Sequence, residues 1–114
     1  YPMVVWFTGY DWAFPLTDND EDDLAEALDR GSNLFLSSQD YLYVSDITPF
    51  GRNYLGVGSY AGEMTTTQVV GVRNNPISQL LPSYSLTYPY PNRSDTVTPI
   101  ETIDAAFGGV TADP

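Results

Sequence analysis

The chain has 114 residues, 42% of them hydrophobic and 17% charged, which is enough for one small domain with a core. Fifteen acidic residues stand against four arginines, and the resulting formal net charge of −11 argues against binding to nucleic acids or to anionic membranes. Because cysteine and histidine are absent, the chain cannot supply the usual ligand sets for zinc, iron–sulfur clusters or haem.

A strand, a helix and a second strand are predicted at the start of the chain. Residues 3–7 are apolar without alternation, as in a strand covered on both faces. Acids at the start of the segment 18–30 favour a helix, Leu24, Ala27 and Leu28 recur on one face, and Gly31 ends it. Residues 33–38 are typical of a buried strand. This order predicts a βαβ unit with parallel strands.

The later signals are weaker. Short helical or irregular pieces are expected over residues 40–44 and 48–57, and the glycine cluster at 56–62 predicts a flexible loop. Further strands are expected over three segments: 65–72, the stretch from 83, and 104–107. Prolines 89 and 91 place a loop between the last two of these. We expect a single α/β domain over 1–108 and a C-terminal linker over 109–114.

Polar and aromatic residues follow the first two strands where each strand ends. Because the carboxyl ends of parallel strands meet at one edge of a sheet, the segments 10–14 and 37–41 should lie together there. This edge is the expected place for any ligand contact. The predicted contact residues are Tyr10, Asp11, Trp12, Ser37, Ser38, Gln39 and Asp40.

The segment around Ser37 and Ser38 has the strand–turn–helix character of a nucleophile elbow. A serine nucleophile needs a base within hydrogen-bond reach, and without histidine or lysine only a carboxylate such as Asp40 is at hand. That is a poor base for serine. We therefore predict no catalytic residue and interpret the serines as small residues that cap the following turn.

Asp18, Asp20 and Asp22 match the first alternate positions of an EF-hand loop. Asp23 stands where that loop needs glycine, and the helical leucines that follow would pull such ligands apart. The acids are better explained by the positive end of the helix dipole. The three aspartates stay weak metal candidates, and a surface Ca²⁺ site elsewhere stays open; no other cofactor is expected.

Loop aromatics form the last candidate site. The rings of Tyr10, Trp12, Phe14 and the tyrosines at 84, 88 and 90 either stack a sugar or a peptide, or cover the ends of a small core. Asn92-Arg93-Ser94 fits a glycosylation sequon, a pattern that is common by chance.

The stretches VVWFTGYDW, LTDNDEDDLAEALDRGSNLFLSSQDYLY and PFGRNYLGV together resemble the class I glutamine amidotransferase-like, or flavodoxin-like, domain of secreted multidomain bacterial proteins, often beside peptidases. The resemblance covers residues 3–58 well. It implies an α/β fold, with a mostly parallel sheet flanked by helices in a flavodoxin-like or Rossmann-like three-layer sandwich. The family's catalytic cysteine and histidine are absent, and its first strands would precede Tyr1, so the sandwich is expected to be incomplete.

Three functions follow as hypotheses. The first is a non-catalytic accessory or interaction domain of an extracellular protein, which contacts neighbouring domains of the same polypeptide or pairs as a homodimer through an exposed sheet edge. The second is a hydrolase or amidotransferase-like enzyme whose site is completed by residues outside this sequence. The third is a calcium-stabilised carbohydrate-binding module. Neither nucleic-acid binding nor membrane insertion is expected, since no apolar run is long enough to span a bilayer.

Overall fold

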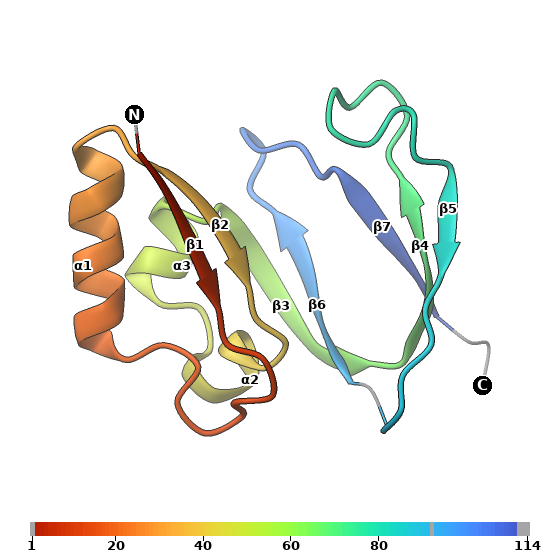
Figure 1. Cartoon of the computed structure of the whole chain (residues 1–114), viewed down its shortest axis with the longest axis horizontal. Coiled ribbons are helices and arrows are strands. Elements are labelled where there is room, and N and C mark those ends of the chain that lie inside the picture. Colours follow the sequence, from red (N-terminus) through yellow and green to blue (C-terminus); the bar gives the residue numbers. More distant parts are fainter. Residues whose placement is uncertain (1, 92, 112–114) are drawn as a thin grey trace.

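A computed structural model describes residues 2–91 and 93–111. Three helices and seven strands alternate unevenly along them (Figure 1). The helices are α1 (Asp18–Asp29), α2 (Tyr41–Ser45) and α3 (Pro49–Asn53). The strands are β1 (Met3–Phe7), β2 (Asn33–Ser37), β3 (Val57–Met64), β4 (Thr66–Gly71), β5 (Ser83–Ser85), β6 (Ser94–Pro99) and β7 (Phe107–Thr111).

The predicted βαβ unit is present: β1 and β2 pair in parallel, with Val5 opposite Phe35. Helix α1 connects them and begins with a capping box, in which the Thr17 hydroxyl accepts from the Asp20 amide and the Asp20 carboxylate accepts from the Thr17 amide. After its end, Gly31 adopts a φ of 89°, which a residue with a side chain rarely tolerates. The local signals in the sequence were therefore sufficient for this unit.

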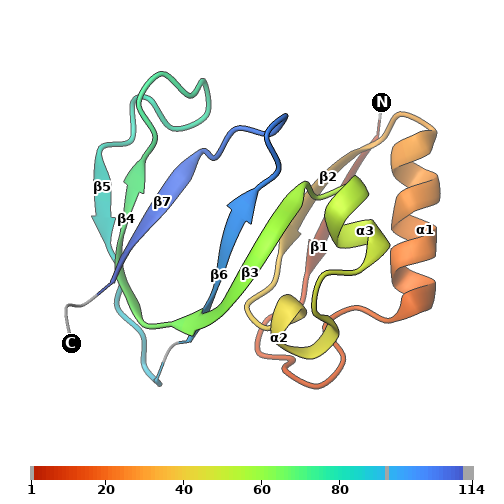
Figure 2. The ribbon, with the colours of Figure 1, turned by 180° about the vertical axis from the view of Figure 1, so that it is seen from behind.

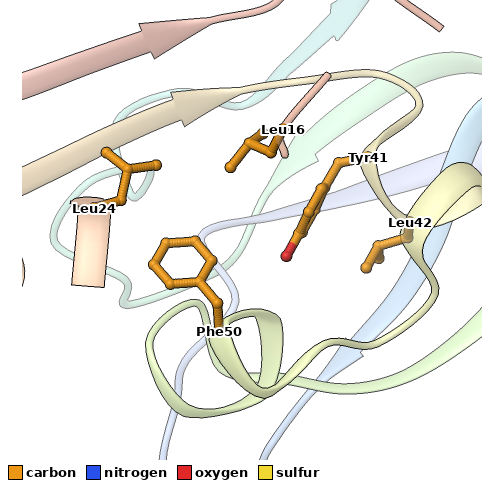
Figure 3. Close-up of a cluster of buried hydrophobic side chains, with 5 residues drawn as sticks. All are labelled: Leu16, Leu24, Tyr41, Leu42 and Phe50. Carbon is orange, nitrogen blue, oxygen red and sulfur yellow. The ribbon is translucent and has the colours of Figure 1, made fainter. Parts of the chain in front are cut away.

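The hydrophobic core lies between the βαβ unit and the short helices (Figure 3). Its buried members are Leu16, Leu24, Tyr41, Leu42 and Phe50. Alternate residues of β1 and β2, among them Trp6 and Leu36, pack against this cluster. The helices thus cover one face of the parallel pair, as the two opposite views show (Figures 1 and 2).

A buried polar network ties the three helices together. Glu21 of α1 is only 8% exposed, and its Oε1 accepts from the Tyr41 hydroxyl at 2.6 Å and from Thr48 Oγ1 at 3.1 Å. Thr48 also caps α3 by accepting from the Gly51 amide. Burial and the contact with Glu21 raise the pKa of the Tyr41 hydroxyl above its ordinary value of 10.0, so the hydroxyl remains a hydrogen-bond donor to Glu21 even in moderately alkaline solution.

The other face of the parallel pair is bare. Met3, Val5, Phe7 and Phe35 point away from the core and are 59–75% exposed. The prediction that residues 3–7 form a strand covered on both faces is therefore wrong for this structure. The lack of alternation is real, but within the described residues the helices pack on one side only.

The predicted mostly parallel sheet is wrong beyond this pair. Strand β3 pairs antiparallel with β6, and β4 lies between β5 and β7, antiparallel to both. The structure is therefore neither flavodoxin-like nor a three-layer sandwich. A parallel crossover needs about a dozen residues or more, usually including a helix. After β2 the helices are only five residues each, and no helix follows α3 in the described part of the chain.

Two segments expected to be irregular are strands. The glycine cluster at 56–62, predicted as a flexible loop, forms most of β3. Its glycines allow close strand pairing, since a Cβ on Gly58 would stand 2.9 Å from the Pro99 carbonyl oxygen. Gly62, at a φ of 93°, lies where the pairing register shifts, and such bulges commonly use glycine. The prediction of a flexible loop over residues 56–62 is therefore wrong, because most of this segment is paired with β6.

The end of the chain also differs from prediction. Strand β7 begins at Phe107, where the expected strand 104–107 ends, and continues to Thr111. Residues 109–111 therefore lie in a strand and not in a linker, while residues 112–114 lie outside the described part. β6 covers residues 94–99, which the prediction left within and after a proline-rich loop. β6 pairs with β3 and β7 pairs with β4, and both partners are distant in the sequence.

Candidate ligand-binding edge

Two open clefts adjoin at the carboxyl ends of β1 and β2. The main cleft, of about 520 Å³, is lined by the ends of both strands, the start of α2 and part of β6; its residues include Phe7, Leu36, Ser37, Ser38, Gln39, Leu42, Tyr88 and Asp95. The rim pocket, of about 220 Å³, is lined by Tyr10, Trp12, Gln39, Asp40, Glu63, Pro91 and Arg93. Gln39 belongs to both, so we treat them as one edge.

The predicted contact residues gather at this edge, with one exception. Six of them line the main cleft or the rim pocket. Asp11 does not, because its Oδ1 accepts from the amides of Ala13 and Phe14, both at 3.0 Å. Asp11 is therefore a turn residue that shapes the loop carrying Tyr10 and Trp12.

The serines lie in the main cleft, and among the described residues neither serine is hydrogen-bonded to a carboxylate. The Thr8 hydroxyl donates to Ser38 Oγ at 3.1 Å, which holds that side chain at the end of β2. The N-cap residue of α2 is Asp40, so the predicted capping role of Ser37 and Ser38 is wrong. Asp40 itself makes no side-chain cap hydrogen bond. This arrangement can donate and accept hydrogen bonds to a ligand, whereas activation of a serine nucleophile needs a base hydrogen-bonded to its hydroxyl.

Asp95 on β6 lines the main cleft, and sequence reasoning missed it. Its Oδ2 accepts from the Leu42 amide at 3.0 Å, while its Oδ1 is buried without a hydrogen-bond partner among the described residues. Burial raises the pKa of the Asp95 carboxyl, and hydrogen bonds from Leu42 and Tyr60 oppose that shift only in part. The charges of Asp40 and Glu63 raise it further.

Carboxylates outnumber cations at the edge. Burial, and then the charge of Glu63, raise the pKa of Asp40. The guanidinium of Arg93 lies 3.8 Å from Glu63 Oε2, and its side chain is 74% exposed. Its backbone carbonyl accepts from the Gln39 side chain at 3.2 Å. Of the three carboxyl groups, only Glu63 is paired with an arginine among the described residues, so the edge has a negative potential.

Part of the predicted aromatic platform is assembled here. The Tyr10 and Tyr90 rings meet edge to face with centroids 5.1 Å apart, and the Tyr88 centroid lies 6.4 Å from that of Tyr90. Trp12 completes the group beside Tyr10 in the rim pocket. Phe14 lines neither cleft. Tyr84 is on β5, in a different sheet.

The weak metal candidates are divided between two places. The carboxylate of Asp20 accepts from both the amide and the hydroxyl of Thr17, and these bonds lower its pKa. Asp18 and Asp22 line a separate cleft between α1 and α3. Within residues 2–91 and 93–111, no group of three or more acidic side chains is arranged to hold a metal ion. Ca²⁺ binding therefore stays a prediction, and the sequon residue Asn92 lies outside the described residues.

Glu63 and Asp95 carry no local signal in the sequence that marks them as site residues. They reach the edge because β3 and β6 pair antiparallel, with Glu63 opposite Asp95. Only knowledge of that pairing would have joined them to residues 10–12 and 37–40.

No family model, curated protein or solved structure matches the chain. No helix in the described residues is both long and apolar enough to cross a bilayer.

Proposed function

We propose that the chain is a non-catalytic interaction domain that binds a partner through the edge formed by the main cleft and the rim pocket. The observation that carries this proposal is the pair of exposed rings, Tyr10 at 65% and Trp12 at 62%, beside two adjoining clefts with polar walls. Exposed aromatic rings next to hydrogen-bonding groups are the usual anchors of binding surfaces.

The chemistry of the edge favours binding over catalysis. Its hydroxyls have no histidine, cysteine or lysine to activate them, since the chain contains none of these residues. The rival hydrolase would need a base from other polypeptide, and no contact at the edge favours it. The carbohydrate-binding alternative would use the same rings. It therefore differs from our proposal in the class of ligand and not in the place of binding.

The setting of the domain rests on the resemblance of its first half to modules of secreted bacterial proteins. We infer an accessory domain of an extracellular multidomain protein, in which neighbouring domains are the nearest partners. The negative net charge is in keeping with this setting.

A homodimer is a second candidate assembly, because β1 pairs only with β2 in the described residues and so has a free edge. Light scattering across a concentration series tests it, and a monomer at every concentration would reject it.

The interaction proposal is tested by selecting a random peptide library on the full chain and measuring the selected peptides against two variants. Trp12→Ala removes a ring of the rim pocket. Phe14→Ala removes a ring of the same loop that is more exposed, at 75% against 62% for Trp12, and lines neither cleft. Selected peptides should lose binding to the first variant and keep it to the second. Equal binding to both variants, or no selected peptide, would overturn the proposal.

A further inference from the structure

We propose that the partner bound at this edge is a basic peptide segment, whose arginine or lysine side chain enters the rim pocket between the aromatic rings and the carboxylates of Asp40 and Glu63. This inference rests on the proposed function and names the chemistry of the partner.

Charge complementarity is the first argument. Glu63 lies opposite Asp95 in the β3–β6 pair, and Asp40 and Glu63 line the same rim pocket. The charges of Asp40 and Glu63 both raise the pKa of Asp95. The one nearby cation, Arg93, is largely solvated at 3.8 Å from Glu63. A ligand cation would relieve this repulsion, whereas an anionic or phosphorylated ligand would add to it.

The aromatic rings give the second argument, which does not depend on the charges of the carboxylates. Tyr10 and Trp12 expose most of their surface at the mouth of the rim pocket. A guanidinium or ammonium group is attracted to the face of such rings, most strongly to tryptophan. An arginine can stack on a ring and donate to a carboxylate at the same time, because its fork of donors is planar.

The main cleft is the reason that we propose a peptide and not a small amine as the ligand. It adjoins the rim pocket at Gln39 and has apolar walls, including Phe7 and Leu36, together with the hydroxyls of Ser37 and Ser38. Residues next to the cation in an extended segment would lie in this cleft. A free amine would fill only the rim pocket.

The cleft between α1 and α3 is the natural internal control. It is also acidic, with Asp18, Glu21 and Asp22 in its wall. A cation drawn only by the net charge of the chain would collect there as well. Glu21 is already engaged by Tyr41 and Thr48, and Asp22 is exposed, so substitution of Asp22 leaves the network intact.

The test is a nuclear magnetic resonance titration of the full ¹⁵N-labelled chain with three probes. They are the peptide acetyl-Gly-Gly-Arg-Gly-Gly-amide, the same peptide with citrulline, which keeps the shape and lacks the charge, and argininamide alone. The arginine peptide should shift the Trp12 indole and Gln39 signals and bind about tenfold more tightly than the citrulline peptide. Argininamide should bind more weakly and leave the Ser37 and Ser38 signals unmoved.

Variants complete the test. Glu63→Gln and Trp12→Ala should each weaken the arginine peptide several-fold, followed on the Gln39 signal, while Asp22→Asn should not. Unchanged thermal unfolding shows that each variant is folded. Equal binding of the arginine and citrulline peptides would overturn the basic partner, and so would equal shifts at α1. Neither result would overturn the proposed function, which is tested separately by the library selection. Selected neutral peptides that need Trp12 for binding would still support it.

Discussion

The first half of the molecule, up to Leu55, and the second half, from Met64, are stabilised in different ways. All the buried hydrophobic side chains of the described residues lie in the first half. The second half is built from strands β4 to β7, and its fully buried side chain is Ser78, whose hydroxyl donates to the Val72 carbonyl at 3.3 Å. The first half therefore depends on side-chain packing, and the second on backbone pairing and turns.

The candidate binding edge draws on both sides of this division. Tyr10, Trp12 and Gln39 come from loops of the first half, while Asp95 comes from β6. The link between them is the hydrogen bond from the Leu42 amide to Asp95 and the packing of Tyr60 on the core. A ligand should therefore bind at the edge only when the two halves are packed against each other.

The largest difference between the halves is expected for leucine truncation. Leu24→Ala removes a side chain that is 4% exposed and should cost about 2–5 kcal/mol of unfolding free energy. Leu80→Ala removes one that is 87% exposed and should change stability by less than about 0.5 kcal/mol. Denaturant unfolding measures both. Equal losses would show that the second half has a core of its own.

Gly71→Ala should break the second half selectively. A Cβ there would stand 2.3 Å from the Leu81 carbonyl oxygen and 2.5 Å from that of Ser78, so the turn that follows β4 must move. We expect a loss of about 1–3 kcal/mol. Hydrogen exchange should show lost protection in β4 and β5 and little change in β2.

The matched control for this substitution is Gly108→Ala in β7, where a Cβ would meet nothing within 4 Å. If Gly71→Ala reduced protection in β1 and β2 as much as in β4, the two halves would unfold as one unit.

Thr17→Ala should lower the unfolding free energy of the first half by about 1 kcal/mol, because it removes the hydroxyl that accepts from the Asp20 amide in the capping box of α1. The pKa of Asp20 should rise, since the hydroxyl that lowers it most is lost. Asp20 stabilises the wild type above its ordinary pKa and loses that contribution as pH falls through its lower folded value. Thr17→Ser should keep both effects, and an Asp20 titration that did not change would contradict this account.

The smallest expected effect is a change in pH dependence. Asp95 has a raised pKa in the folded chain, so the folded state holds its proton more tightly than the unfolded state. Stability should therefore fall as pH rises from the ordinary value of 3.8 toward the folded pKa, and stay lower above it. Asp95→Asn should remove this fall.

Unfolding curves of Asp95→Asn and wild type across pH would measure that difference, with Asp22→Asn as the control for a change in net charge. A wild-type fall of stability that persisted in Asp95→Asn would assign it to Asp40, whose pKa is raised in the same direction.

Sequence reasoning was accurate where structure is local. The β1–α1–β2 unit follows from the acidic start of the helix, the recurrence of Leu24 and Leu28, and Gly31 at its end. It failed for β3, β6 and β7, whose glycine- and proline-containing segments carry weak strand signals and are completed by partners far along the chain. The same limit applies to the candidate edge, for which residues 37–40 were predicted and Glu63 and Asp95 were not.

By itself, the sequence determined the bounds of α1 to within one residue, the parallel first pair and the acidic composition without histidine or cysteine, because caps, periodicity and composition act within a few residues or over the whole chain. Only the tertiary structure decided that the remaining strands are antiparallel and that Asp95 lines the same cleft as Ser37, Ser38 and Leu42. The hydrogen bond that joins Leu42 to Asp95 spans 53 residues of sequence. Such a contact depends on which strand edges are free to pair once the first core has formed, and no local pattern encodes that choice.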